Sequence, residues 1–165
     1  MANIYKLQPA AIAAYPMYRG LASLLGVKVI PTGLNFDDEL ATLKKHYNEH
    51  DFFYIHYKPA DAAGEDGDFA GKVRSLEQFD AFIPRLKALE PDVLIVTGDH
   101  STPAVLGGHS WHAVPLLVHS KLTKGEGVAN FSERACAFGS LGRMPTVDLM
   151  LVALANAEKL IKFGP

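Results

Sequence analysis

Carboxylate and imidazole side chains gather just after two stretches of the chain that the sequence marks as strands. The residues concerned are Asp61, Glu65, Asp99, His100 and His109, with His112 close behind. Oxygen and nitrogen ligands mixed in this way suit Mn²⁺ or Zn²⁺, whereas a lone Mg²⁺ would use fewer imidazoles. Two such ions a few ångströms apart hold both the attacking and the leaving oxygen of a transferring phosphoryl group. These residue types therefore predict a metal site suited to phosphoryl transfer.

Asp99 and His100 are the most specific part of this pattern. They follow the apolar run Val93–Thr97, which is typical of a strand buried on both faces of a parallel sheet. A charged pair at the end of such a strand has to be hydrogen-bonded, ion-paired or metal-bound, because burying it otherwise costs several kcal/mol. The acidic, glycine-rich segment Lys58–Gly71 is less specific, since taken alone it fits an ordinary solvated turn equally well.

Apolar periodicity predicts strands and helices that alternate along the chain. Short strands are predicted at 27–30, 52–56, 93–97 and 114–119. Helices are predicted at 16–26, 36–50, 72–89 and 146–161, and loops at 58–71 and 121–127. This alternation indicates an α/β fold with a largely parallel sheet and right-handed crossovers. Because ligands gather at the carboxyl ends of strands in such sheets, the candidate ligands are expected at neighbouring strand ends.

Length and composition narrow the class of protein. The chain has 165 residues, which predicts a single domain over 1–165, and its net charge of −2 provides no basic field for binding nucleic acid. A single thiol, Cys136, excludes an internal disulfide framework. The longest uncharged apolar stretch, 149–157, is far shorter than the roughly 20 residues that span a bilayer. The N-terminus has no signal-peptide pattern, so we expect no membrane association and a cytoplasmic location.

The sequence around the second group of ligands resembles a known family. The run Val96-Thr-Gly-Asp-His-Ser-Thr-Pro103, followed by His109-Ser and Val114-Pro115, resembles the alkaline phosphatase superfamily. More narrowly, it is similar to the archaeal-type 2,3-bisphosphoglycerate-independent phosphoglycerate mutases. The segments 10–26, 56–77 and 131–143 match the same family in order, so the resemblance covers nearly the whole chain. It implies a three-layer sandwich with a mostly parallel sheet, of which this chain is an incomplete part.

The resemblance also divides the candidate ligands between two divalent metal ions, Mn or Zn. It implies one metal on Asp61, Glu65 and His109, and a second on Asp99 and His100. The family has a histidine where this chain has Glu65; a carboxylate still binds these metals but adds negative charge, and His112 is the alternative for this position. In the family the second metal also needs an aspartate and the nucleophilic serine, which are both expected upstream of anything in this chain.

Three functions are compatible with this reading. The first is a phosphoglycerate mutase of glycolysis, which moves phosphate between the 3- and 2-hydroxyls of glycerate; this chain would be its C-terminal metal-binding part, without the serine nucleophile. Such a part would be inactive alone and would need the N-terminal half, as a separate chain or within a longer protein. The second is a non-catalytic metal-binding remnant or regulatory domain. The third, hydrolysis of a phosphate or sulfate ester, needs the same serine.

Strand edges left open by a missing half also lead us to expect a homodimer or a tightly associated partner.

Overall fold

The chain folds into two compact units, which a computed structural model describes over residues 2–125 and 128–160. The first unit comprises residues 1–62 and 71–81, and the second comprises residues 63–70 and 82–165. The ends of the predicted loop 121–127 and of the predicted helix 146–161 lie outside the described residues. The single domain predicted over 1–165 stays a prediction, and each unit is described by itself.

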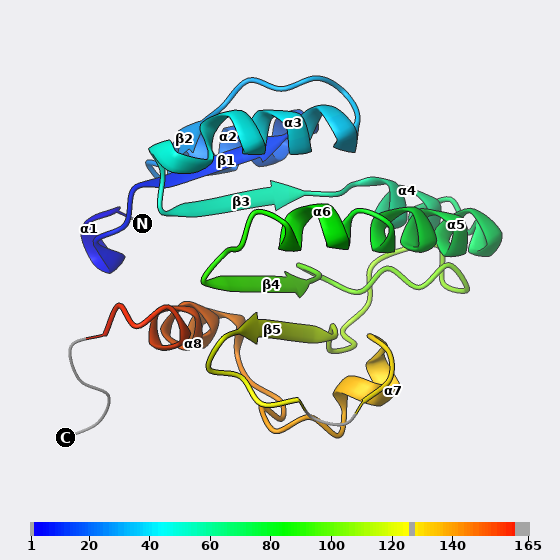
Figure 1. The fold of residues 1–165 in the computed structure, drawn as a ribbon. Coiled ribbons are helices and arrows are strands. Elements are labelled where there is room, and N and C mark those ends of the chain that lie inside the picture. The colour runs from blue at the N-terminus through cyan, green and yellow to red at the C-terminus, as the bar shows by residue number, and fades with distance from the viewer. Residues whose placement is uncertain (1, 126–127, 161–165) are drawn as a thin grey trace. The chain divides into compact units, whose positions relative to one another are not determined.

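A three-stranded parallel sheet forms the centre of the first unit (Figure 1). Its strands are β1 (Pro9–Ala13), β2 (Lys28–Val29) and β3 (Phe52–His56), in the order β2-β1-β3. The sequence pattern predicted β2 and β3 but not β1, because alanine has a low propensity for strands. Every residue of β1 is nonetheless buried, since small side chains let covering helices approach the central strand closely. The predicted α/β class with a parallel sheet is confirmed.

Helices cover both faces of this sheet, and a short helix, α1 (Ala2–Tyr5), precedes it. The helix α2 (Pro16–Leu24) contacts β1 and β2, and α3 (Phe36–His46) contacts β1 (Figure 1). Proline in the first turn suits α2, and the side chain of Asn35 caps α3 by accepting from the Asp38 amide at 2.9 Å. A single 3₁₀ turn, η1 (Tyr47–Glu49), leads from α3 to β3. The first unit is therefore layered as helix, sheet and helix.

Glu39 of α3 is an acidic side chain buried in this unit. It is 2% exposed, and its Oε1 accepts a hydrogen bond of 2.7 Å from the amide of Ala14, just after β1. Its Oε2 has no hydrogen-bond partner among the described residues. Burial raises the pKa of Glu39 from 4.5 to about 7, because desolvation disfavours the charged form by more than the Ala14 hydrogen bond favours it.

The segment that was predicted as a loop over 58–71 contains a helix. It forms α4 (Pro59–Glu65), which begins in the first unit and ends in the second, followed by α5 (Phe69–Asp80). The loop prediction was wrong because Pro59 occupies the first helical turn, where proline needs no amide hydrogen bond. The helix predicted over 72–89 is likewise interrupted, and its last part is the separate helix α6 (Ile83–Lys87), which has Pro84 in its first turn.

An antiparallel strand pair is the centre of the second unit (Figure 1). The strand β4 (Val93–Thr97) runs against β5 (Leu116–Ser120), and Val93 lies opposite Ser120. This pairing corrects the expectation that Val93–Thr97 pairs in a parallel sheet. The strand β4 is also only half-buried, with Thr97 exposed, whereas its composition predicted a fully buried strand.

Short helices complete the second unit. They are α7 (Glu133–Cys136), the 3₁₀ turn η2 (Thr146–Asp148) and α8 (Leu149–Asn156). The last of these contacts β4 and is anchored to β5, since the hydroxyl of Ser120 donates to the Asn156 side chain at 2.9 Å. Among the described residues, no helix is long and apolar enough to cross a membrane.

Candidate metal centre

The helix α4 carries the two candidate carboxylates of the first metal site. Asp61 lies in its first turn and Glu65 is its last residue. Gly67 ends the helix in the left-handed conformation, with φ of 69°, and the Asp68 amide donates to the Ala63 carbonyl at 2.9 Å. This is a Schellman ending, which fixes the direction in which the chain leaves the helix. Glu65 is thereby held at a well-defined helix end.

The loop after β4 brings two histidines back to one place. A backbone hydrogen bond of 2.9 Å from the Ser110 amide to the Ser101 carbonyl closes the loop, in an isolated antiparallel bridge. His100 and His109 each come directly before one residue of that bridge. Residues far apart along the loop are therefore returned to the same end of β4.

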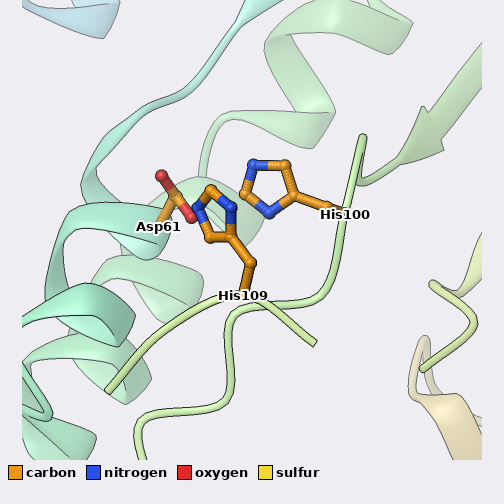
Figure 2. Close-up of side chains that lie close together, drawn as sticks. All are labelled: Asp61, His100 and His109. Carbon is orange, nitrogen blue, oxygen red and sulfur yellow. The ribbon is translucent and has the colours of Figure 1, made fainter. Parts of the chain in front are cut away.

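The two imidazole rings lie close together in the second unit (Figure 2). Their centroids are 3.8 Å apart, at an interplanar angle of 35°. Glu65 of the same unit lies beside them, with its Oε1 at 3.4 Å from Nε2 of His109. All three are reachable from solvent, since their side chains are 28% (His100), 56% (His109) and 44% (Glu65) exposed. The structure thus brings His100 and His109 together and places Glu65 next to His109.

Asp99 stays next to His100. Its Oδ2 lies 3.6 Å from Nε2 of His100, and its Oδ1 accepts from the His100 amide at 3.1 Å. On its other side, the His100 ring has Nδ1 at 3.0 Å from the hydroxyl of Thr102, which is only 3% exposed. A buried hydroxyl against one ring nitrogen orients the imidazole, and the other nitrogen lies on the side of Asp99. Thr102 was missed from the sequence, where it differs from other loop threonines only in following the histidine by two positions.

The remaining candidates occupy other surroundings. Asp61 belongs to the first unit, where its carboxylate forms an ion pair with Lys58 (Figure 2 labels Asp61). His112, the alternative to Glu65, has Nδ1 at 2.8 Å from the Ser110 hydroxyl and stacks on the exposed Trp111 ring. The contact to His109 is thus made by Glu65, whereas His112 is engaged with its own loop neighbours.

The donor set of the second unit fits a divalent transition metal. It offers two neighbouring imidazoles and a carboxylate beside one of them, from side chains that stay partly open to solvent. Nitrogen and oxygen donors in this mixture are those of Zn²⁺ and Mn²⁺ sites. The Thr102 hydroxyl, which holds the His100 ring, is the kind of outer support that such sites need.

Comparisons with known proteins agree with this chemistry. A family model described as the Metalloenzyme superfamily matches residues 1–156. The chain belongs to this superfamily. It is 52% identical, over 98% of its length, to a probable 2,3-bisphosphoglycerate-independent phosphoglycerate mutase of Thermosipho africanus. It is also 52% identical, over 99% of its length, to a protein of the same name from Thermus thermophilus. The resemblance noted in the sequence is confirmed at this level.

The chain spans only part of these superfamily members. It covers 40% of the Thermosipho africanus protein and 41% of the Thermus thermophilus protein. A solved structure of a Pyrococcus horikoshii protein superposes with a TM-score of 0.92 at 28% identity, covering 99% of this chain and 53% of that one. A cofactor-independent phosphoglycerate mutase from Thermoplasma acidophilum shares the fold, with a TM-score of 0.74 at 24% identity over 94% of this chain and 38% of its own.

Proposed function

We propose that this chain is the metal-binding part of a phosphoglycerate mutase, which interconverts 3- and 2-phosphoglycerate in glycolysis. The observation that carries the proposal is the close pair of His100 and His109, with Glu65 beside His109, because these donor types suit a divalent metal. Relatives named as probable phosphoglycerate mutases, at 52% identity, support the choice of reaction. The substrate, phosphoglycerate, and a cytoplasmic location remain part of this proposal.

The proposed ligands form two sets. Asp61, Glu65 and His109 hold one metal, and Asp99 with His100 provides part of the second. The inclusion of Asp61 is supported by its place in α4, because residues four apart on a helix lie on the same face. Two carboxylates at that spacing repel each other by a few tenths of a kcal/mol, which a cation between them would offset.

The chain's own residues prepare this site for a phosphoryl group. When bound, divalent metals supply Lewis-acid stabilisation of the transferring oxygens. Thr102 keeps the His100 ring oriented, and Lys58 forms an ion pair with Asp61 that a metal bound by the same carboxylate would have to displace. Ser101 and Ser110 belong to the loop that carries the candidate ligands, and neither is proposed as the nucleophile. The attacking serine is assigned to the part of the relatives that this chain does not match.

Metal binding is tested first, on the chain alone. The double variant Asp99→Ala with His100→Ala, and separately Glu65→Ala, should lose Mn²⁺ or Zn²⁺ measured by plasma mass spectrometry after gel filtration. The matched control is His119→Ala, an exposed histidine on β5 in the same unit, which should keep full stoichiometry. Full retention of metal in the double variant would overturn the ligand assignment. Glu65→His should preserve or tighten binding if Glu65 occupies a ligand position.

Activity is tested with the remainder of the enzyme supplied. The chain is co-produced with the unmatched part of the Thermus thermophilus relative, and mutase activity is followed with Mn²⁺ in an assay coupled through enolase. The proposed mutase function is supported if the pair converts 3-phosphoglycerate to 2-phosphoglycerate and this activity disappears in the Asp99→Ala, His100→Ala variant. The alternative, a non-catalytic metal-binding remnant or regulatory domain, is favoured by Glu65, which stands where the resemblance implies a histidine. Stoichiometric metal without turnover in the reconstituted pair would select that alternative.

A further inference from the structure

The carboxyl ends of β1 and β3 bring an aromatic ring, an ammonium group and a carboxylate together within the first unit. Ala13 of β1 pairs with His56 of β3 in parallel register, so the two strands end level with each other. Tyr15 and Lys58 follow these paired residues by two positions each, and Asp61 lies in the first turn of α4. Ligands of open α/β sheets bind at this end of the strands, so the three side chains occupy a position suited to recognition.

The Lys58 ammonium contacts two different groups. It forms an ion pair with Asp61, and its Nζ lies over the Tyr15 ring at 5.2 Å from the centroid. That distance is within the range of cation–π attraction. The side chains of Lys58 and Asp61 are 27% and 17% exposed, so water screens this pair less than it screens a pair on the open surface. The ammonium therefore has both a carboxylate and an aromatic face as partners.

Tyr15 is held in place by the two helices that cover the sheet. Its ring packs on Tyr18 of α2 with centroids 6.1 Å apart, and Tyr18 is only 8% exposed. The preceding residue, Ala14, donates its amide to the buried Glu39 carboxylate of α3 at 2.7 Å. The segment between β1 and α2 is thus fixed from both sides, and it presents the Tyr15 ring to Lys58 at a defined place.

A lysine is an unusual residue at the start of a helix. Lys58 directly precedes α4, and its carbonyl accepts hydrogen bonds from the amides of Asp61 and Ala62. Residues preferred at this position accept a further hydrogen bond with their side chain, which an ammonium cannot do. A positive charge is also unfavourable near the N-terminus of a helix. Helix stability therefore favours another residue here, and local rules of this kind are broken at functional sites.

Metal binding changes the charge that Lys58 meets. In the proposed function Asp61 and Glu65 hold one divalent cation, whose charge the two carboxylates cancel. The Asp61 carboxylate then no longer neutralises Lys58, while the Tyr15 ring keeps the ammonium nearby. Since like charges repel at short range, the lysine opposes binding of the metal alone. A phosphate group bound together with the metal removes this opposition, because its oxygens accept charge-assisted hydrogen bonds from an ammonium.

We propose that Lys58, positioned by Tyr15, is an anion-binding residue of this centre. It neutralises Asp61 when the metal is absent, and it binds the phosphate group of a phosphate monoester when the metal is present. Metal and phosphate consequently bind cooperatively, and each tightens the binding of the other by the same factor. The inference rests on the proposed function for Asp61 as a metal ligand, and it adds a residue that recognises the phosphate group.

Manganese affinity with and without inorganic phosphate tests the proposal on the chain alone. Electron paramagnetic resonance of free Mn²⁺ gives the dissociation constant in both conditions. In the parent, saturating phosphate should tighten Mn²⁺ binding at least about tenfold, the contribution of one charge-assisted hydrogen bond. In Lys58→Met, Mn²⁺ without phosphate should bind about threefold tighter than in the parent, because the ammonium no longer competes for Asp61. The tightening by phosphate should be at least about tenfold smaller than in the parent.

Two matched variants separate the charge of Lys58 from other effects of its replacement. Lys58→Arg keeps a positive charge and should keep the tightening by phosphate. Lys28→Met removes an exposed lysine on β2 of the same unit and should behave as the parent in both conditions. Tyr15→Leu keeps the ammonium but removes the ring beneath it, and should reduce the tightening by phosphate about threefold. Circular dichroism establishes that the variants compared are folded.

Each outcome of these measurements decides the proposal. Equal tightening by phosphate in the parent and in Lys58→Met would show that Lys58 is only a structural partner of Asp61, and the proposal would fail. If Lys58→Met does not fold, Tyr15→Leu decides in its place, and unchanged tightening there overturns the proposal. A parent chain that binds no Mn²⁺ overturns both this inference and the proposed ligands. If the tightening depends on Lys58 but the reconstituted pair has no mutase activity, the proposed function fails while the role of Lys58 stands.

Discussion

The central strand of the first unit is packed more completely than either strand of the second unit. The central strand β1 of the first unit is buried throughout, and Ile12 within it is fully buried. In the second unit β4 and β5 are half-exposed along most of their length, with Ser120 as the buried exception. Four of the five candidate ligands nevertheless belong to the second unit. Rigid packing and candidate chemistry are thus concentrated in different parts of the chain, as is common when functional groups lie on loops.

The largest expected difference between the units comes from matched truncations of isoleucine. Ile12→Ala in β1 should lower the free energy of unfolding by about 4 kcal/mol, because it leaves a cavity in a fully buried site. Ile95→Ala in the half-buried β4 should cost about 2 kcal/mol, since less surface returns to water. Urea unfolding followed by circular dichroism measures both. Equal losses would contradict the contrast in packing between the two units.

The second expected difference is in pH dependence, which Glu39 confers on the first unit. Its folded pKa of about 7 exceeds the value of 4.5 expected when unfolded, so the folded state binds its proton more tightly. Stability from this group is therefore fully present below pH 4.5, falls as the pH rises, and is lost above about pH 7. Glu39→Gln keeps an oxygen acceptor for Ala14 and removes the ionisation.

The expected result for Glu39→Gln is a gain of about 2 to 3 kcal/mol relative to the parent at pH 8, with little change at pH 4. Native-state hydrogen exchange at the two pH values assigns the effect to a unit. Amides of β1 and β3 should report the gain, and those of β4 and β5 should report less of it. If the protection of the β1 amides, relative to their intrinsic exchange rate, were the same at both pH values in the parent protein, Glu39 would have an ordinary pKa.

The smallest expected difference involves the helix caps. Asn35→Ala removes the acceptor for the Asp38 amide at the start of the eleven-residue α3 and should cost about 1 kcal/mol. Ser132→Ala removes a longer contact of 3.3 Å to the Ala135 amide in the four-residue α7, and should cost about half as much. Thermal unfolding of the two variants compares them. A larger effect at Ser132 would show that α7 contributes more to the second unit than its length suggests.

Much of the fold could be predicted from local patterns, and the misses have physical causes. Strand β3 was predicted from its aromatic and β-branched residues and helix α3 from its apolar period and acidic start, which are local signals. Strand β1 was missed because alanines become strand residues only through burial between two helices, which no local pattern encodes. Helix α4 was missed because Pro59 and Gly64 were taken as breakers, although proline suits a first turn and Gly64 is buried in the helix.

The candidate site was predictable in its residue types more than in its geometry. The approach of His100 to His109 depends on the bridge between Ser101 and Ser110, and no local sequence pattern predicts that bridge. The choice of Glu65 over His112 as the neighbour of His109 likewise follows from the end of α4 at Gly67. Binding of metal by these residues stays a prediction.

The bridge between Ser101 and Ser110 separates the position of the two histidines from the sequence of the loop between them. Since the bridge fixes both ends of residues 102–109, the separation of the two imidazoles depends on the closure and only weakly on what the loop tip contains. Lengthening a closed loop adds little free energy, about 0.6 kcal/mol for each doubling. The sequence between Pro103 and Gly107 is therefore the place where this loop can change while the paired histidines keep their spacing.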